Sequence, residues 1–97
     1  MAGFVQIIEF QTSRVDEMQA LAEQRRAELA AETAPHRVTW TADRDRPGFY
    51  LVIAEFESYE VAMANSSRPE VSEFSAELGK LCEAPPKFYN LDVVASW

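Results

Sequence analysis

The stretch Gly48–Phe74, GFYLVIAEFESYEVAMANSSRPEVSEF, begins with a segment that is apolar on both of its alternating faces. Phe49–Glu57 has the length and composition of a β-strand, in which successive side chains point to opposite sides of the sheet. One side carries Phe49, Leu51 and Ile53, and the other carries Tyr50, Val52, Ala54 and Phe56. Because both sides are apolar, both need a cover that keeps water out.

The remainder of the same stretch has helical signals. Ser58 is typical of a helix N-cap, and it opens a short helix that runs to about Asn65. Ser67-x-x-Glu70 indicates that the helix restarts, with Pro69 at the first helical position. We therefore expect one helix in two pieces after the strand.

The rest of the chain completes a β-α-β-β-α-β order. A capping box at Ser13-x-x-Asp16 indicates where the first helix begins. Such an order favours an α+β fold, a ferredoxin-like sandwich with a four-stranded antiparallel sheet, and we expect residues 1–97 to form one domain. The other predicted segments are strands at Phe4–Gln11, Arg37–Asp43 and Lys87–Ala95 and a helix from Arg14 to about Ala31.

Two helices can cover one face of such a sheet. An 18-residue helix is about 27 Å long and an eight-residue strand about 26 Å, so the helices form a single layer. The uncovered face would expose an apolar patch larger than monomers usually tolerate. A second copy packed sheet to sheet is the simplest cover, so we expect a homodimer that forms a dimeric α/β barrel.

Composition excludes several partners and locations. The net charge of −7 repels phosphate, so we expect neither nucleic acid nor an anionic membrane surface as a partner. No apolar run approaches the roughly 20 residues of a membrane helix. Residues 1–4 enter a strand pattern without a basic region, so we expect no signal peptide and a cytoplasmic location.

The chain resembles the dimeric α/β-barrel superfamily, and within it the antibiotic biosynthesis monooxygenase-like proteins. The resemblance rests on the order of elements and on Val52–Phe74, where a strand leads into a capped helix that breaks and restarts with an aromatic residue. It implies a ligand site between the sheet and the helices of each subunit. It also implies one of three roles: cofactor-independent oxygenation of phenolic polyketides or quinols, haem degradation, or a barrel with no known activity.

Haem degradation is disfavoured by the residues present. The haem-degrading members resemble one another in an Asn on the first strand, a Trp on the second helix and a His further along. This sequence has Gln6 and Glu9 on the first strand, Tyr59 near the start of the second helix, and Asn65 and Ser66 around the histidine position.

His36 and Asn65 are the candidate catalytic residues. His36, the single histidine of the sequence, stands just before the second predicted strand. It is either an exposed loop residue or a general base at the mouth of a pocket. Asn65 precedes the helix break, where its amide either caps the break or points into the site.

Aromatic residues supply the candidate substrate contacts. Trp40 lies in the middle of its strand, where it either packs in the core or dimer interface or stacks on a ligand. Tyr50 and Tyr59 bring phenol groups that either pack or hydrogen-bond an oxygen-bearing ring. Glu9 and Glu55 are each flanked by apolar residues on their strands. Each is either a base or, as we favour, the partner of an arginine at the dimer seam. We expect the two carboxylates to lie at opposite ends of the sheet.

We expect no metal and no cofactor, since the sequence has no phosphate loop, nucleophile elbow or metal-ligand spacing. The function favoured is a small cofactor-independent monooxygenase, or a related enzyme, acting on an aromatic metabolite such as a quinol or polyketide. The alternative is a non-catalytic barrel that binds a small ligand or has a structural role.

Overall fold

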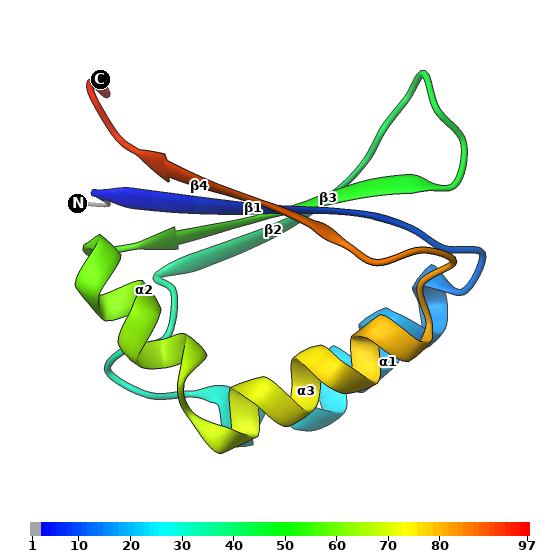
Figure 1. Ribbon diagram of the computed structural model, residues 1–97, viewed down its shortest axis with the longest axis horizontal. Helices are drawn as coiled ribbons and strands as arrows, with labels where there is room; N and C mark the ends of the chain where they lie inside the picture. Colours follow the sequence, from blue (N-terminus) through cyan, green and yellow to red (C-terminus); the bar gives the residue numbers. More distant parts are fainter. Residues whose placement is uncertain (1–2) are drawn as a thin grey trace.

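The computed structural model describes residues 3–97. Met1 and Ala2, which form part of the segment used to argue against a signal peptide, lie outside the described residues. The elements follow the predicted order, with the second helical region divided in two (Figure 1). Their bounds are β1 (Phe4–Gln11), α1 (Val15–Leu29), β2 (Arg37–Ala42), β3 (Phe49–Phe56), α2 (Tyr59–Ser66), α3 (Pro69–Lys80) and β4 (Lys87–Asp92).

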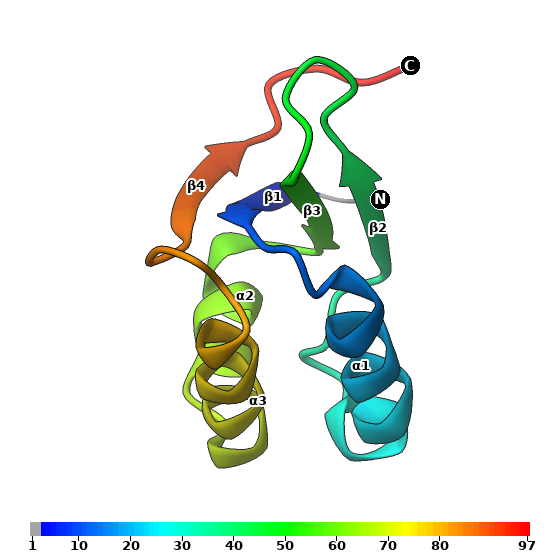
Figure 2. The same ribbon diagram turned by 90° about the vertical axis from the view of Figure 1, so that its right-hand side faces the viewer.

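The four strands form one antiparallel sheet in the order β2-β3-β1-β4. β1 pairs with β3 from Phe4↔Phe56 to Gln11↔Phe49, and it pairs with β4 on its other side. The helices all lie on one side of this sheet (Figures 1 and 2). The predicted α+β, ferredoxin-like β-α-β-β-α-β fold is therefore confirmed. Among residues 3–97, no helix has the length and apolar character needed to cross a bilayer.

Two of the predicted helix-start signals after β3 are confirmed. Ser58 is the N-cap of α2, and its hydroxyl accepts a hydrogen bond from the Val61 N–H at 3.1 Å. Pro69 is the first residue of α3, a position at which its missing N–H costs nothing. Ser67 is not the cap of α3, as its hydroxyl instead donates to carbonyls of the preceding turn.

The predicted capping box at Ser13 is wrong. The N-cap of α1 is Arg14, and no side chain within the described residues caps it. Thr12, the other residue suited to capping, accepts a hydrogen bond from the Arg14 N–H and donates to the Leu81 carbonyl at 2.6 Å. The Thr12 hydroxyl, which the local sequence offers as a helix cap, thus donates to Leu81, a residue far along the chain.

The last strand is shorter than predicted and ends at Asp92 rather than Ala95. Asp92 pairs with Phe4, where β1 begins, so β4 has no further strand residue to pair with. One more backbone bond follows, from the Val93 N–H to the Gly3 carbonyl at 3.1 Å.

The core lies between the sheet and the helices, in two clusters. One cluster joins Phe4, Ala54 and Phe56 to Ala62 of α2. The other joins Phe10 and Val52 to the helices, with fully buried Met18 of α1 and half-buried Leu78 and Leu81 packed around it. The face under the helices is thus the one that carries Phe4, Phe10, Val52, Ala54 and Phe56.

The opposite side of the sheet, which we call the open face, also carries apolar side chains. Its centre is Ile7, whose neighbours in the strand register are Ile53 and Tyr89. Within residues 3–97, no helix covers this side (Figure 2). The open face comprises Val5, Ile7, Phe49, Leu51, Ile53, Tyr89 and Leu91.

Glu9 lies at one end of the open face, and its carboxylate has partners in the same chain. It accepts a hydrogen bond from the Tyr89 hydroxyl at 3.1 Å and lies 3.5 Å from the guanidinium of Arg46, in the β2–β3 hairpin. Glu55 pairs with Val5 at the other end of β1. The predicted separation of the two carboxylates is thus confirmed, and the arginine beside Glu9 comes from its own chain.

Candidate functional site

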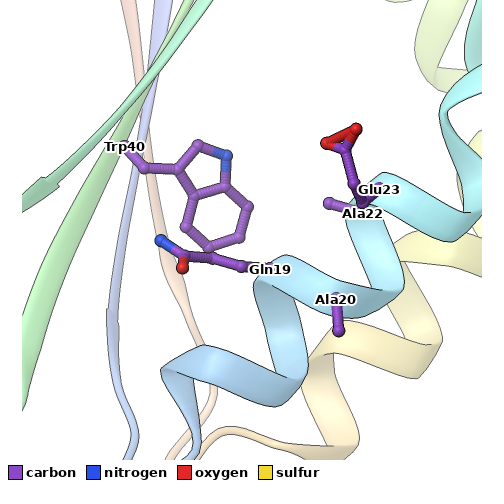
Figure 3. A pocket seen from close by; sticks show the side chains of 5 residues that line it. All are labelled: Gln19, Ala20, Ala22, Glu23 and Trp40. Atoms are coloured by element: carbon purple, nitrogen blue, oxygen red, sulfur yellow. The ribbon is translucent and has the colours of Figure 1, made fainter.

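A groove runs between α1 and β2, on the helix side of the sheet. Its larger part has a volume of about 480 Å³ and is open to solvent. Trp40 forms its sheet wall, and α1 forms the other wall (Figure 3). The residues that line this part are Gln19, Ala20, Ala22, Glu23 and Trp40.

A smaller hollow of about 240 Å³ continues the groove towards the end of β2. It shares Gln19 and Trp40 with the larger part and reaches Tyr50. We call the two parts together the Trp40 groove. The residues that line the smaller part are Val15, Asp16, Gln19, Trp40, Thr41, Ala42 and Tyr50.

Aromatic packing fixes the two rings of the Trp40 groove. Trp40 meets Phe10 edge to face, with ring centroids 5.9 Å apart. Tyr50 stacks on the same Phe10 at 5.7 Å and an interplanar angle of 21°. Phe10 is buried, so both rings are held by the core, and each still has a surface on the groove.

Polar groups stand opposite the indole of Trp40. The Gln19 side chain reaches towards the ring, and the Glu23 carboxylate faces the same space from the next turn of α1 (Figure 3). The carboxylate is also paired with Arg26 at 3.1 Å. The groove therefore offers an aromatic surface edged by an amide and a negative charge, a combination suited to a ring that bears hydroxyl groups.

The other predicted site residues lie nearer the opposite end of the sheet. His36 is exposed just before β2, and its backbone N–H donates to the Glu55 carbonyl at 2.8 Å. Tyr59 is the first residue of α2, and its ring meets Phe4 edge to face at 5.5 Å. The structure thus brings Trp40 and Tyr50 together and places His36 and Tyr59 apart from them.

Asn65 is buried at the junction of α2 and α3. Its side-chain oxygen accepts hydrogen bonds from the Thr33 hydroxyl at 3.2 Å and from the Arg68 guanidinium at 3.0 Å. These contacts tie the helix break to the loop that precedes His36. Both of these contacts are made by the side-chain oxygen, which accepts, whereas the amide nitrogen of an asparagine is a donor.

Known proteins match this chain in three-dimensional structure but not in sequence. No family model and no curated protein matches the sequence. An asparagine-to-alanine mutant of SnoaB, a cofactor-independent oxygenase from Streptomyces nogalater, matches with a TM-score of 0.81 and 14% identity, over 99% of this chain and 97% of that one. An antibiotic biosynthesis monooxygenase matches with a TM-score of 0.73 and 12% identity, over 95% and 99%.

This chain has the antibiotic biosynthesis monooxygenase fold. A conserved protein from Methanosarcina mazei Go1 also matches, with a TM-score of 0.79 and 12% identity over 95% of this chain and 93% of that one. The resemblance seen in the sequence is thereby confirmed as a likeness of fold.

Sequence reasoning missed two residues of the Trp40 groove. Gln19 and Glu23 are polar residues on a helix, which usually indicates a face in solvent. They lie four positions apart and so share one side of α1. That spacing was the available signal, but it does not reveal that this side faces Trp40.

Among residues 3–97, no three histidine, cysteine or acidic side chains lie close enough together to hold a metal ion. Cys82 is half-buried, and its thiol lies 3.4 Å from the Leu78 carbonyl, to which it donates. Burial raises the pKa of the Cys82 thiol. The thiolate, which is the nucleophilic form, is therefore scarce at neutral pH.

We expect Cys82 to react slowly with thiol reagents in the folded protein. Because its pKa is raised, the rate of reaction with a disulfide reagent should rise with pH along a curve displaced to higher pH than that of the unfolded chain. Stopped-flow measurements between pH 6 and 10, with and without guanidinium chloride, check this. Equal curves in the two conditions would contradict it.

Proposed function

We propose that this protein is a small cofactor-independent monooxygenase acting on a phenolic or quinol-type aromatic metabolite. The observation that carries the proposal is the Trp40 groove, whose volume of about 480 Å³ lies in the range of small-molecule sites. The likeness of fold to SnoaB, described as a cofactor-independent oxygenase, supports the same chemistry.

The substrate would lie along β2. Trp40 offers its ring to one end of a multi-ring substrate, and Val38, 48% exposed on the same face of the strand, offers an apolar surface beside it. His36 stands about 13 Å from Trp40 along the chain, which is four extended residues. An elongated polyketide can therefore stack on Trp40 and present a phenol near His36.

His36 is the proposed base in this arrangement. It takes the phenolic proton, and the electron-rich anion then reacts with dioxygen. The substrate supplies the electrons: the ring carbon para to the phenol oxygen bonds to dioxygen and becomes a carbonyl, and the O–O bond breaks. The second oxygen atom leaves as water with the hydrogen of that carbon and the phenolic proton that His36 returns. The amide nitrogen of Asn65, whose side-chain oxygen holds Thr33 and Arg68, is the proposed donor to the developing negative oxygen.

Ligand binding is the first test of this proposal. In a Trp97→Phe variant, Trp40 is the remaining tryptophan, so its fluorescence reports on the groove. We expect quinols and phenolic polyketides to quench it and to raise the melting temperature. Trp40→Ala should weaken binding about tenfold, while Trp97→Phe should bind as the unchanged protein does.

Oxygen uptake without any added cofactor tests the catalytic step. His36→Ala should slow uptake by about a hundredfold or more and leave ligand binding intact. If no aromatic ligand quenches Trp40 and no uptake occurs, the enzymatic proposal is wrong.

The engaged side-chain oxygen of Asn65 favours a second candidate, a protein that binds an aromatic ligand without turning it over. Both of its recorded contacts, with Thr33 and Arg68, serve the helix junction. Quenching of Trp40 without oxygen uptake would identify this function.

We also propose that two copies pair through the open face. Support comes from its apolar centre of Ile7, Leu51 and Ile53, on the side away from the helices (Figure 2). Burying this surface in a symmetric dimer would remove it from water, at about 25 cal/mol for each Å² buried.

A further inference from the structure

Within residues 3–97, the lining of the Trp40 groove carries two negative charges and no positive charge. The charged residues are Asp16 and Glu23, which lie seven positions apart on α1, or about 10 Å along the helix axis. Both side chains are exposed, and both belong to the acidic excess that gives the chain its net charge of −7. The helix wall of the groove is therefore negative along its length.

The opposite wall of the groove also favours a positive charge. The face of an aromatic ring has a negative electrostatic potential, and among aromatic side chains tryptophan attracts cations most strongly. Trp40 and Tyr50 are held in place by their contacts with buried Phe10. Glu23 and the Trp40 indole stand on opposite sides of the same open space (Figure 3). A cation in that space is attracted from both sides.

The arginine that pairs with Glu23 leaves this carboxylate accessible. Arg26 lies outside the groove lining, and the side chains of Arg26 and Glu23 are 79% and 70% exposed. Exposed ion pairs of this kind are weak, because water competes for both groups. A ligand cation can therefore share the Glu23 carboxylate with Arg26. Asp16 takes part in none of the ion pairs found within residues 3–97.

We infer that the Trp40 groove takes an aromatic substrate that carries a protonated amine. The inference rests on the proposed function and names the substrate class for the same groove. The ammonium lies between the indole and the carboxylates of α1, and the phenol extends along β2 towards His36. A phenolic acid of the same shape would bring its carboxylate beside Asp16 and Glu23, where like charges repel. The net charge of the chain attracts cations as they approach and so favours the same choice.

Three phenols of similar size test this preference. Tyramine carries an ammonium, 4-propylphenol is neutral, and 4-hydroxyphenylacetate carries a carboxylate. Isothermal titration calorimetry should give a dissociation constant for tyramine about tenfold or more below that for 4-hydroxyphenylacetate. Added salt should narrow the difference, because it screens charges that are in contact with water.

A double variant tests whether the preference comes from the groove. Asp16→Asn combined with Glu23→Gln should raise the dissociation constant for tyramine about tenfold and leave that for 4-propylphenol unchanged. The matched control combines Glu60→Gln with Glu73→Gln, which makes the same change in net charge at exposed positions of α2 and α3, outside the groove lining. It should bind all three phenols as the unchanged protein does.

The outcomes separate this inference from the proposed function. Equal affinity for tyramine and 4-hydroxyphenylacetate would overturn the inference, as would a double variant that still prefers tyramine, and both results leave the oxygenase proposal standing. Tyramine binding that depends on Asp16 and Glu23 would support the inference even without oxygen uptake, in which case the second candidate function, binding without turnover, would hold. If none of the three phenols binds, both the inference and the proposed site are wrong.

Discussion

Replacing Arg68 by methionine should lower the free energy of unfolding by about 3 kcal/mol. The guanidinium, which is 18% exposed, joins the end of α1 to the junction of α2 and α3. It donates to the carbonyls of Glu28 and Leu29 at 3.1 and 3.0 Å and to the Asn65 side chain at 3.0 Å. Methionine keeps the apolar stem but removes the donor to the two carbonyls, while the Asn65 oxygen keeps its hydrogen bond from Thr33.

The carbonyls at the end of a helix have no partner within the helix, which is why the loss should be large. Arg68→Lys should recover little, because one ammonium cannot reproduce the planar fork of donors. Arg26→Met is the matched control. Its ion pair with Glu23 joins side chains that are 79% and 70% exposed, so its removal should cost about 0.5 kcal/mol or less.

Urea unfolding followed by circular dichroism measures both variants. All samples need one protein concentration, since a dimer makes the apparent stability depend on it. An Arg68→Met variant as stable as Arg26→Met would show that the junction does not depend on the guanidinium.

Replacing Ile53 by lysine should convert the proposed dimer into a monomer. Ile53 lies at the centre of the open face, directly opposite Ile7 in the strand register. The change removes an apolar side chain and brings a charge into the interface, and in a twofold dimer it does so twice. We expect the dissociation constant to rise by about a thousandfold or more.

Sedimentation velocity checks this prediction. Gln24→Lys is the matched control, because it makes the same charge change at an exposed position of α1, on the far side of the sheet. That variant should sediment as the unchanged protein does. If Ile53→Lys sediments like the control, the dimer does not form through the open face.

The fold was predictable because its main signals are local. Alternation along Phe49–Phe56 and the starts at Ser58 and Pro69 depend on neighbouring residues, and each appears in the structure as expected. Thr12 shows the limit: its hydroxyl bonds to Leu81, 69 positions away, and no local pattern contains that contact.

The site was harder to predict because it depends on distances between elements. The sequence gives Trp40 and Tyr50 as aromatic residues on their strands, and they meet because both pack on Phe10. The role of Gln19 depends on how far α1 stands from β2, a distance set by packing across the whole core. The role of Arg68 could not be predicted from the sequence, because its hydrogen-bond partners lie up to 40 positions away along the chain.

The position of the Trp40 groove at a border of the sheet has a consequence for how the protein can diversify. β2 is an outermost strand, and the helix residues facing it, Gln19 and Glu23, are exposed. Exchanges at such positions typically alter stability by about 0.5 kcal/mol or less. The kind of ligand that the groove binds can therefore change through mutation of these residues, while Phe10 and Met18 preserve the packing of the core.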